Sequence, residues 1–236
     1  MVFCFVGAWR RLYLSLESAG ENPEIAEKLV TIAAIAGILG SRINYIISNF
    51  EEFLRNPAEM IFTGAGFVYY GGFLLAAFSL FIFAYRNKIN FFRFADLAAP
   101  SLAIGYGIGR IGCHLSGDGD YGKVTDSFFR FSYQLGVSPT PRGVFVHPTP
   151  IYESLLALVL CGVLVQLQKN NTLSRNGQMF GLYILCSSVT RFFIENLRIE
   201  PITSYGFTEA QVTSLVLFLP ALLLTVFGAP KSLDRK

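Results

Sequence analysis

The sequence contains little charge for its length. Only 15% of its 236 residues are Asp, Glu, Lys or Arg, and 53% are apolar, whereas soluble domains carry about 25% charged residues. A chain of this size has too little interior to hide so much apolar surface from water. The composition therefore indicates an integral membrane protein and excludes a disordered chain.

Other features are scarce as well. The formal net charge is only +3 and the charges are dispersed, which excludes a basic nucleic-acid-binding protein. The four cysteines lie far apart, without CxxC or Cys/His ligand spacing, so they predict neither a disulfide framework nor a structural zinc site. We expect Cys4, Cys113, Cys161 and Cys186 to be buried free thiols. The sequence shows no tandem repeat and no low-complexity stretch.

Six segments are long and apolar enough to cross a bilayer, which takes about 20 residues. Two are free of charge, and four tolerate one or two charged residues. The predicted spans are Leu29–Asn49, Met60–Tyr85, Phe94–Leu115, Pro150–Gln168, Gln178–Leu197 and Ala210–Pro230. Residues 1–9 are apolar and end at Arg10-Arg11. We interpret them as the stub of a seventh span that would begin before Met1, because a signal peptide would carry its charges first.

Lysine and arginine are unevenly divided between alternate loops, and this bias predicts the orientation. One set holds Arg10, Arg11, Lys28, Arg86, Lys88, Arg93, Lys169, Arg175, Lys231, Arg235 and Lys236, and the other holds Arg55, Lys123, Arg130, Arg142 and Arg198. The richer set is predicted to be cytoplasmic, with the C-terminus inside. We thus predict an all-α polytopic bundle in a single domain over 1–236, in which residues 117–149 form an external cap loop rich in Gly and Pro.

Three arginines remain inside the predicted spans: Arg42, Arg110 and Arg191. An arginine within a span costs about 2.5–3.5 kcal/mol on insertion scales, so it normally faces the protein interior and marks a function. All three are predicted in the outer half of their spans, together with Glu153 and the Tyr69-Tyr70 pair. Guanidinium groups with few carboxylates beside them would suit an anionic lipid phosphate.

A purely structural interpretation stays open for each of these residues. Arg191, Glu195 and Arg198 are spaced i, i+4 and i+7 and could form one ion-pair ladder, and Glu153 could neutralise Arg42 or Arg110. The glycines around Arg110, in GYGIGRIG, favour close helix packing over a phosphate loop. His147 at the start of the fifth full span could be a cap or could titrate near neutral pH, and His114 is more consistent with packing than with catalysis.

Several motifs resemble those of the bacterial prolipoprotein diacylglyceryl transferase family, in the family's order. These are Gly40-Ser41-Arg42 with Tyr45, Tyr70-Gly71-Gly72, Gly109-Arg110-Ile111-Gly112-Cys113 followed by Gly117-Asp118, His147-Pro148-Thr149-Pro150-Ile151-Tyr152-Glu153, Arg191-Phe192-Phe193-Ile194-Glu195 with Arg198, and Phe207-Thr208-Glu209-Ala210-Gln211. Each motif alone is short and weak evidence. The motif that begins at Gly109-Arg110 and the motif that begins at His147-Pro148 are, in combination, specific for this family.

The resemblance implies a seven-span enzyme of the bacterial inner membrane. It would move the sn-1,2-diacylglyceryl group of phosphatidylglycerol to the lipobox cysteine of a prolipoprotein, with its site facing the outer leaflet and without a metal or organic cofactor. The implied catalytic residues are Arg110, Arg191, Tyr70, His147 and Asp118. The implied substrate-binding residues are Arg110, Arg42, Gly71, Gly72, Gly112, Gly117, Tyr152, Glu153, Glu195 and Arg198.

The sequence departs from the family pattern at three positions. Some members of the family have a His at the position of Tyr70, and that His has been proposed as the base. In this sequence, either Tyr70 would orient the substrate or the base would be another residue, with His147 or Asp118 as candidates. Cys113 stands where many members have Asn, and Asp118 where many have Glu.

A second hypothesis from another class is a transporter or lipid-binding protein that uses the same arginines without covalent chemistry. The absence of a repeat and the gathering of the charges near one surface argue against it.

Overall fold

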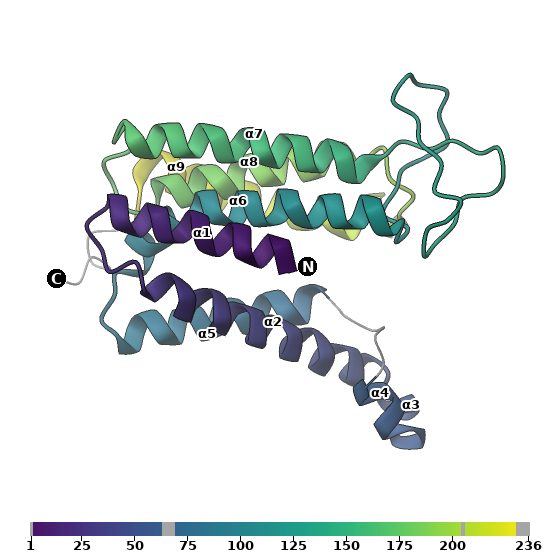
Figure 1. Ribbon diagram of the computed structural model, residues 1–236, viewed down its shortest axis with the longest axis horizontal. Coiled ribbons are helices and arrows are strands. Elements are labelled where there is room, and N and C mark those ends of the chain that lie inside the picture. The colour runs from purple at the N-terminus through teal and green to yellow at the C-terminus, as the bar shows by residue number, and fades with distance from the viewer. Residues whose placement is uncertain (1, 63–68, 204–205, 230–236) are drawn as a thin grey trace. The chain divides into compact units, whose positions relative to one another are not determined.

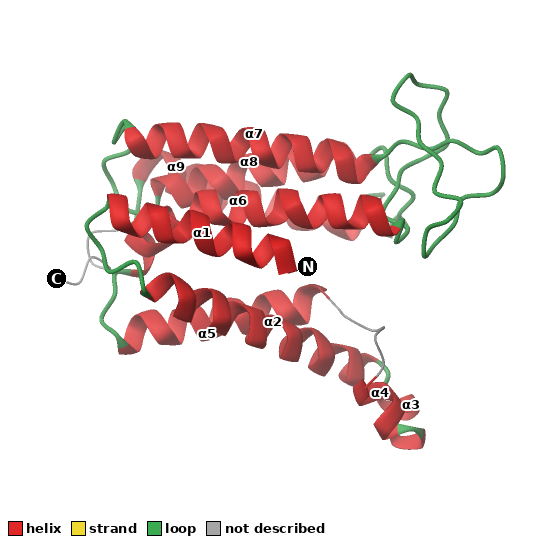
Figure 2. Ribbon diagram, viewed as in Figure 1, coloured by secondary structure: helices red, strands yellow, loops and turns green. Residues whose placement is uncertain are grey.

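The computed structural model describes residues 2–62, 69–203 and 206–229. Side chains are described for these residues except Glu59, Phe62, Tyr69 and Tyr70. The described regular structure is helical, as predicted, and the remainder is loop with isolated β-bridges (Figure 2). The helices are α1 (Val2–Ser18), α2 (Ile25–Ser48), α3 (Phe50–Arg55), α4 (Pro57–Phe62), α5 (Tyr69–Arg86), α6 (Phe91–Ser116), α7 (Thr149–Lys169), α8 (Gln178–Glu195) and α9 (Glu209–Phe227).

The chain divides into two compact units. Among the described residues, the larger unit contains 2–15 and those between 92 and 229, which hold most of α1 and nearly all of α6, together with α7, α8, α9 and the cap. The smaller unit runs from Leu16 to Phe91 and contains α2, α3, α4 and α5. Each unit is described by itself below.

Within the described residues, three helices are long and apolar enough to cross a membrane: α2, α7 and α9. Each coincides with a predicted span to within a few residues, because the prediction rested on apolar runs of bilayer length. Helices α6 and α8 also match predicted spans, but their charged residues make them less apolar. Met60 lies in α4, and α5 begins at Tyr69, so residues 63–68 of that predicted span lie outside the described part. The count of six spans plus a stub stays a prediction.

Helix α1 does not end at the Arg10-Arg11 pair, so the predicted end of the apolar stub is wrong. The helix continues to Ser18. Arg11 is accommodated because its Nη2 donates a hydrogen bond of 2.7 Å to Oε1 of Gln168 on α7. The fully buried Ser15 donates to the same oxygen at 3.2 Å. These two bonds attach α1 to α7 within the larger unit.

The core of the larger unit lies between α6, α7 and α8. It contains Ala99, Ala103, Cys161, Leu164 and Met179. All four cysteines are free, but only Cys161 is buried, so the expectation of four buried thiols is correct for one of them. The other three are partly exposed.

Asp96, a charge inside a predicted span, caps the start of α8. Its Oδ2 accepts the Gly177 N–H at 2.6 Å, and its Oδ1 accepts the Phe180 N–H at 2.8 Å. The first N–H groups of a helix have no partner within the helix, so a carboxylate from a neighbouring helix can satisfy them. Asp96 therefore fixes the start of α8 against α6.

Helix α9 begins as the sequence indicates. Thr208 and Gln211 form a capping box, in which each side chain accepts the other's backbone N–H, at 3.2 and 3.1 Å. This reciprocal arrangement is a frequent helix start signal. It explains the Thr208-Glu209-Ala210-Gln211 element as a local folding device.

In the smaller unit, α2 and α5 pack closely through glycines. A Cβ on Gly71 would lie 2.3 Å from Cβ of Asn44, and one on Gly72 would lie 2.7 Å from the carbonyl oxygen of Gly37. Only glycine allows the two backbones to approach this far. Gly71 and Gly72 therefore have a packing role that the sequence interpretation did not assign to them.

The predicted cap loop is present between α6 and α7. Figure 1 shows it extending from the adjoining ends of these two helices. Three isolated antiparallel bridges hold it: Gly122 with Arg198, Val124 with Val146, and Phe131 with Val146. The cap is thus tied both to itself and to the segment that follows α8.

Candidate active site

Glu153 is the centre of a buried charge network in the larger unit. It lies in the first turns of α7, where Pro150 occupies an early helix position that needs no N–H partner. Its side chain is 1% exposed, its Oε2 is 2.6 Å from Nε of Arg110 on α6, and its Oε1 is 2.6 Å from Nη1 of Arg191 on α8. One buried carboxylate therefore joins two arginines from two helices.

The ladder predicted along α8 is present. Nη2 of Arg191 lies 3.2 Å from Oε2 of Glu195, and Nε of Arg198 lies 3.6 Å from the same oxygen. Glu195 is 1% and Arg198 3% exposed in their side chains. Because Arg191 also pairs with Glu153, the ladder continues into the network instead of standing alone on a helix face.

Asp120 completes the network, and sequence reasoning missed it. Its carboxylate pairs with Nη1 of Arg110 and, through Oδ1, with Nη2 of Arg198 at 2.6 Å. Its backbone oxygen accepts from Nη1 of Arg198 at 2.9 Å and from the Thr149 hydroxyl at 2.6 Å. Burial opposes ionisation of this carboxyl, but the two arginines outweigh burial and hold its pKa below the usual value.

The same contacts act on Arg198. Burial opposes its charged form, but the neighbouring Asp120 carboxylate favours it, so the pKa of Arg198 lies above its ordinary value. Its Nη2 also donates to Oε1 of Glu200 at 2.7 Å. Arg198 is therefore a permanent cation that holds the Asp120 segment against the end of α8.

Local backbone geometry explains why Asp120, and not Asp118, reaches the arginines. Gly117 and Gly119 adopt positive φ angles of +57° and +99°, which a residue with a side chain rarely adopts. These two turns leave Asp118 exposed while Asp120 is partly buried. The family resemblance selected Asp118 as the acidic residue because it directly follows Gly117. Sequence spacing does not predict the turns that bring Asp120 to the arginines instead.

Gly122 brings three motif segments together. Its N–H donates to the carbonyl oxygen of His147 at 2.8 Å. A Cβ at this position would lie 2.4 Å from the carbonyl oxygen of Leu197 and 3.0 Å from Cβ of His147. Gly122 thus permits the loop after α6, the entry to α7 and the end of α8 to meet. In the sequence, Gly122 follows Asp120 by two positions. The motif interpretation did not use this glycine.

The glycines around Arg110 divide into two kinds. A Cβ on Gly107 would lie 3.1 Å from Leu158, and one on Gly105 would lie 3.3 Å from Cβ of Ala8, so these two serve helix packing. Gly109 and Gly112 have no described atom within 4 Å of such a Cβ. These two positions therefore need no glycine for packing among the described residues.

The histidines and tyrosines have separate environments. His147 Nδ1 lies 3.4 Å from the hydroxyl of Tyr152, and its backbone N–H donates to the Lys123 carbonyl oxygen at 3.1 Å. His114 Nδ1 lies 2.7 Å from the hydroxyl of Tyr133. Burial raises the pKa of Tyr133. His114 is thus a packed residue at the base of the cap, which agrees with the interpretation favoured from the sequence.

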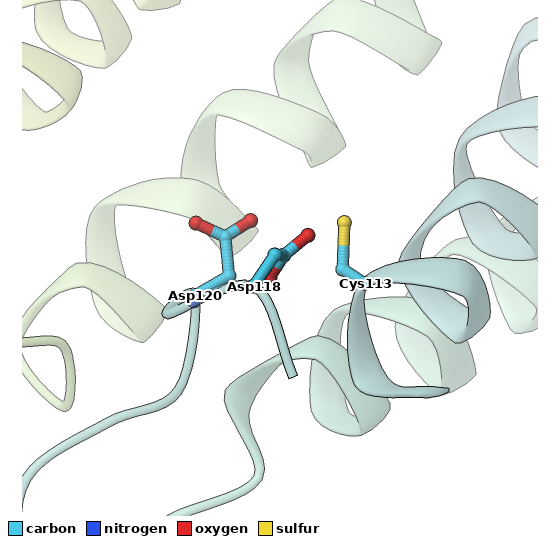
Figure 3. A group of neighbouring side chains, drawn as sticks. All are labelled: Cys113, Asp118 and Asp120. Carbon is cyan, nitrogen blue, oxygen red and sulfur yellow. Dashed lines mark hydrogen bonds between the residues drawn. The ribbon is translucent and has the colours of Figure 1, made fainter. Parts of the chain in front are cut away.

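Cys113, Asp118 and Asp120 lie next to one another, as Figure 3 shows, with possible metal-ligand atoms all within 4.8 Å. The chemistry of the surroundings does not favour a cation there. Asp120 already pairs with two guanidinium groups, and Arg110 Nη1 lies 4.0 Å from the Cys113 sulfur. A metal ion would have to bind against these fixed positive charges.

The predicted residues of the smaller unit form their own contacts. Nη1 of Arg42 donates to the carbonyl oxygen of Met60 at 3.1 Å. Tyr70 lies in the first turn of α5, and its side chain is outside the described part. The predicted gathering of Arg42 and Tyr70 with Arg110 stays a prediction.

The sequence also predicted few carboxylates beside the arginines, and this expectation is wrong. The ion-pair network contains three carboxylates for its three guanidinium groups: Asp120, Glu153 and Glu195 beside Arg110, Arg191 and Arg198. The physical reason is that an arginine can be buried only with a counter-charge. The most exposed guanidinium side chains of the network are those of Arg191, at 26%, and Arg110, at 15%.

The chain is similar in sequence to one family of known proteins. A sequence profile described as prolipoprotein diacylglyceryl transferase matches residues 1–227. Phosphatidylglycerol–prolipoprotein diacylglyceryl transferase 2 of Clostridium perfringens is 34% identical over 208 residues, which cover 87% of this chain and 79% of the relative. The corresponding enzyme of Clostridium botulinum is 32% identical, covering 96% and 89%. That of Bacillus cereus strain G9842 is also 32% identical, covering 84% and 74%.

Proposed function

Because the chain belongs to the prolipoprotein diacylglyceryl transferase family, we propose that it transfers the diacylglyceryl group of phosphatidylglycerol to prolipoproteins. The acceptor is the thiol of the lipobox cysteine that follows the signal peptide. The observation that carries this proposal is the buried pairing of Arg110 and Arg191 through Glu153. These arginines come from two motifs of the family and meet across two helices.

The reaction is a nucleophilic substitution at the glyceryl carbon that bears the phosphate. The cysteine sulfur forms a bond to this carbon while the carbon–oxygen bond to phosphate breaks, and the electron pair leaves with the phosphate. The phosphate group of the lipid has one negative charge, and the glycerol phosphate that departs gains a second. A site that stabilises this growing charge lowers the barrier.

Arg110 and Arg191 are the proposed phosphate ligands. Their guanidinium groups stay charged and can bind phosphate oxygens in a bidentate manner. Glu153 fixes the orientation of both through ion pairs of 2.6 Å. Arg198, at 3% exposure, is better suited to hold Asp120 than to contact the lipid.

The thiol must lose its proton, because the thiolate is the nucleophile. His147 and Asp118 are the candidate bases, and Tyr70 is a candidate for orienting substrate. The ring nitrogen Nδ1 of His147 lies 3.4 Å from the Tyr152 hydroxyl, and Asp118 is exposed beside Cys113. Either group would take the thiol proton, on the imidazole nitrogen of His147 or on a carboxylate oxygen of Asp118.

We further propose the bacterial inner membrane as the location, with the C-terminus in the cytoplasm and the network near the outer leaflet. The support is the distribution of Lys and Arg between alternate loops. The cap adjoins the network ends of α6 and α7 and belongs to the set of loops with five basic residues, against eleven in the other set. This placement would bring the network to the surface at which exported prolipoproteins arrive.

Mass spectrometry of a lipobox peptide tests the proposal. The protein, reconstituted in membranes with phosphatidylglycerol, should add the mass of one diacylglyceryl group to the peptide cysteine and release glycerol phosphate in equal amount. A peptide with Ser in place of that cysteine is the matched control and should not change. Lipid movement across the membrane without any peptide mass shift would contradict the transferase and favour a transporter.

A further inference from the structure

The charge network has no excess of positive charge without a ligand. Three guanidinium groups, of Arg110, Arg191 and Arg198, face the carboxylates of Asp120, Glu153 and Glu195. A fourth carboxylate, that of Glu200, lies 2.7 Å from Nη2 of Arg198 at the exposed side. A lipid phosphate that enters this site adds a further negative charge. In a partly dry environment such an excess is unfavourable, so one carboxylate has to give way.

Exposure and attachment indicate which carboxylate moves. Glu153 and Glu195 are each 1% exposed and are held on helices, whereas Asp120 is 32% exposed and lies on a loop. Moving either glutamate away from its arginines would leave its own buried carboxylate without a counter-charge. Displacing Asp120 from Arg110 leaves Asp120 paired with Arg198 and Arg110 paired with Glu153.

Asp120 also has a second partner that retains it after such a displacement. Its Oδ2 contacts Arg110, but its Oδ1 and its backbone oxygen both accept from Arg198, at 2.6 and 2.9 Å. The Thr149 hydroxyl holds the same backbone oxygen at 2.6 Å. Only the contact with Arg110 therefore has to break, and the Asp120 carboxylate stays paired.

We propose that the Asp120 carboxylate occupies the phosphate position on Arg110 in the lipid-free protein and is displaced by the phosphate of phosphatidylglycerol. Asp120 is thus a positioning residue that competes with the anionic headgroup. It holds Arg110 oriented while the site is empty. After transfer it competes with the doubly charged glycerol phosphate and so assists its release. This inference rests on the proposed function for the identity of the lipid.

Lipid binding to the Asp120→Asn variant tests the competition. Asn keeps the size of the side chain and an oxygen for Arg198 but removes the competing charge. If Asp120 occupies Arg110 for about nine tenths of the time, its neutralisation should tighten binding about tenfold. Binding of phosphatidylglycerol to purified protein in phosphatidylcholine nanodiscs measures this directly. Asp126→Asn, an exposed carboxylate paired with Arg130 on the cap surface, is the matched control and should leave binding unchanged.

The kinetic readouts separate this role from a merely structural one. Asp120→Asn should lower KM for phosphatidylglycerol, strengthen product inhibition by glycerol phosphate by about the same tenfold factor, and lower kcat where product release limits turnover. A variant that is simply misfolded would lose kcat without gaining affinity. Equal or weaker lipid binding by a folded Asp120→Asn protein would overturn the inference.

A measurement on the unaltered protein covers the case in which the variant does not fold. Carbodiimide-driven labelling with glycine ethyl ester reports how accessible a carboxylate is, and mass spectrometry locates the label. Labelling of Asp120 should rise when phosphatidylglycerol is added, and that of Asp126 should stay constant. Unchanged or reduced labelling of Asp120 would overturn the inference. Tighter lipid binding without any transfer to peptide would instead contradict the proposed function and leave the competition supported.

Discussion

Replacement of Glu153 by Gln is the change to which the network should be most sensitive. Gln has the shape of Glu, so packing in α7 is preserved. Its amide group can still accept one hydrogen bond from Arg191, but its NH₂ would then face the Nε–H of Arg110, donor against donor. Arg110 and Arg191 would also lose the carboxylate that they share at 2.6 Å.

The expected magnitude follows from burial. Removing one partner of a buried ion pair costs about 3–5 kcal/mol. Arg110 keeps Asp120 and Arg191 keeps Glu195, so we expect a loss of unfolding free energy near the lower end, about 3 kcal/mol. A guanidinium displaced by about 1 Å from the phosphate can cost about 100-fold in rate, so kcat/KM for diacylglyceryl transfer should fall by about that factor.

The assay pairs peptide transfer in nanodiscs with unfolding in mixed micelles. Glu200→Gln is the matched control, because Glu200 is 37% exposed and pairs only with Arg198. An exposed ion pair contributes about 0–1 kcal/mol, so this control should retain most of its stability and activity. If Glu153→Gln matched Glu200→Gln in both measurements, the role assigned to the buried carboxylate would be refuted.

Three further changes test other parts of the account. Gly122→Ala places a Cβ 2.4 Å from the Leu197 carbonyl oxygen. This overpacking should force the loop away from α8 and lower the rate of transfer at least about tenfold. Wild-type kinetics of this variant would show that the close approach of the Gly122 and Leu197 backbones is unimportant. Asp96→Asn can accept only one of the two N–H groups that Asp96 now caps, so the thermal midpoint should fall in step with a loss of about 1–2 kcal/mol, with little change in KM. The pKa of Asp120 is depressed in the folded protein, so the stability it contributes is complete above its unfolded pKa of about 3.9 and is lost as the pH falls through the lower folded value. The difference in thermal midpoint between the unaltered protein and Asp120→Asn should therefore shrink between about pH 4 and pH 2; a difference that grows on acidification would contradict the assigned ion pairs.

The helices were largely predictable, because bilayer-length apolar runs determine them. Helices α2, α6, α7, α8 and α9 begin and end within a few residues of the predicted spans. The i, i+4, i+7 ladder on α8 followed from helical geometry and is present. The end of α1 was not predictable in the same way, because its extension past Arg11 depends on Gln168 of a distant helix.

The site was predictable in its arginines but not in its counter-charges. Arg110 and Arg191 stood out because they interrupt apolar segments. The sequence interpretation allowed Glu153 to pair with Arg42 or Arg110 but did not foresee its pairing with Arg191. Asp120 was missed because its position depends on two positive-φ glycines, and loop geometry of this kind has no periodic signal. Similarly, the roles of Gly71 and Gly122 follow from backbone approaches between segments far apart in the sequence.

Arg110, oriented by Glu153, is proposed to bind the phosphate of phosphatidylglycerol during transfer. The most direct test is the diacylglyceryl mass shift on a lipobox peptide with the Arg110→Ala protein, measured beside the unaltered protein at equal amounts inserted in the membrane. We expect the shift to be lost in the variant, because the guanidinium cannot be replaced by a neutral methyl group. A full mass shift with Arg110→Ala would contradict the account.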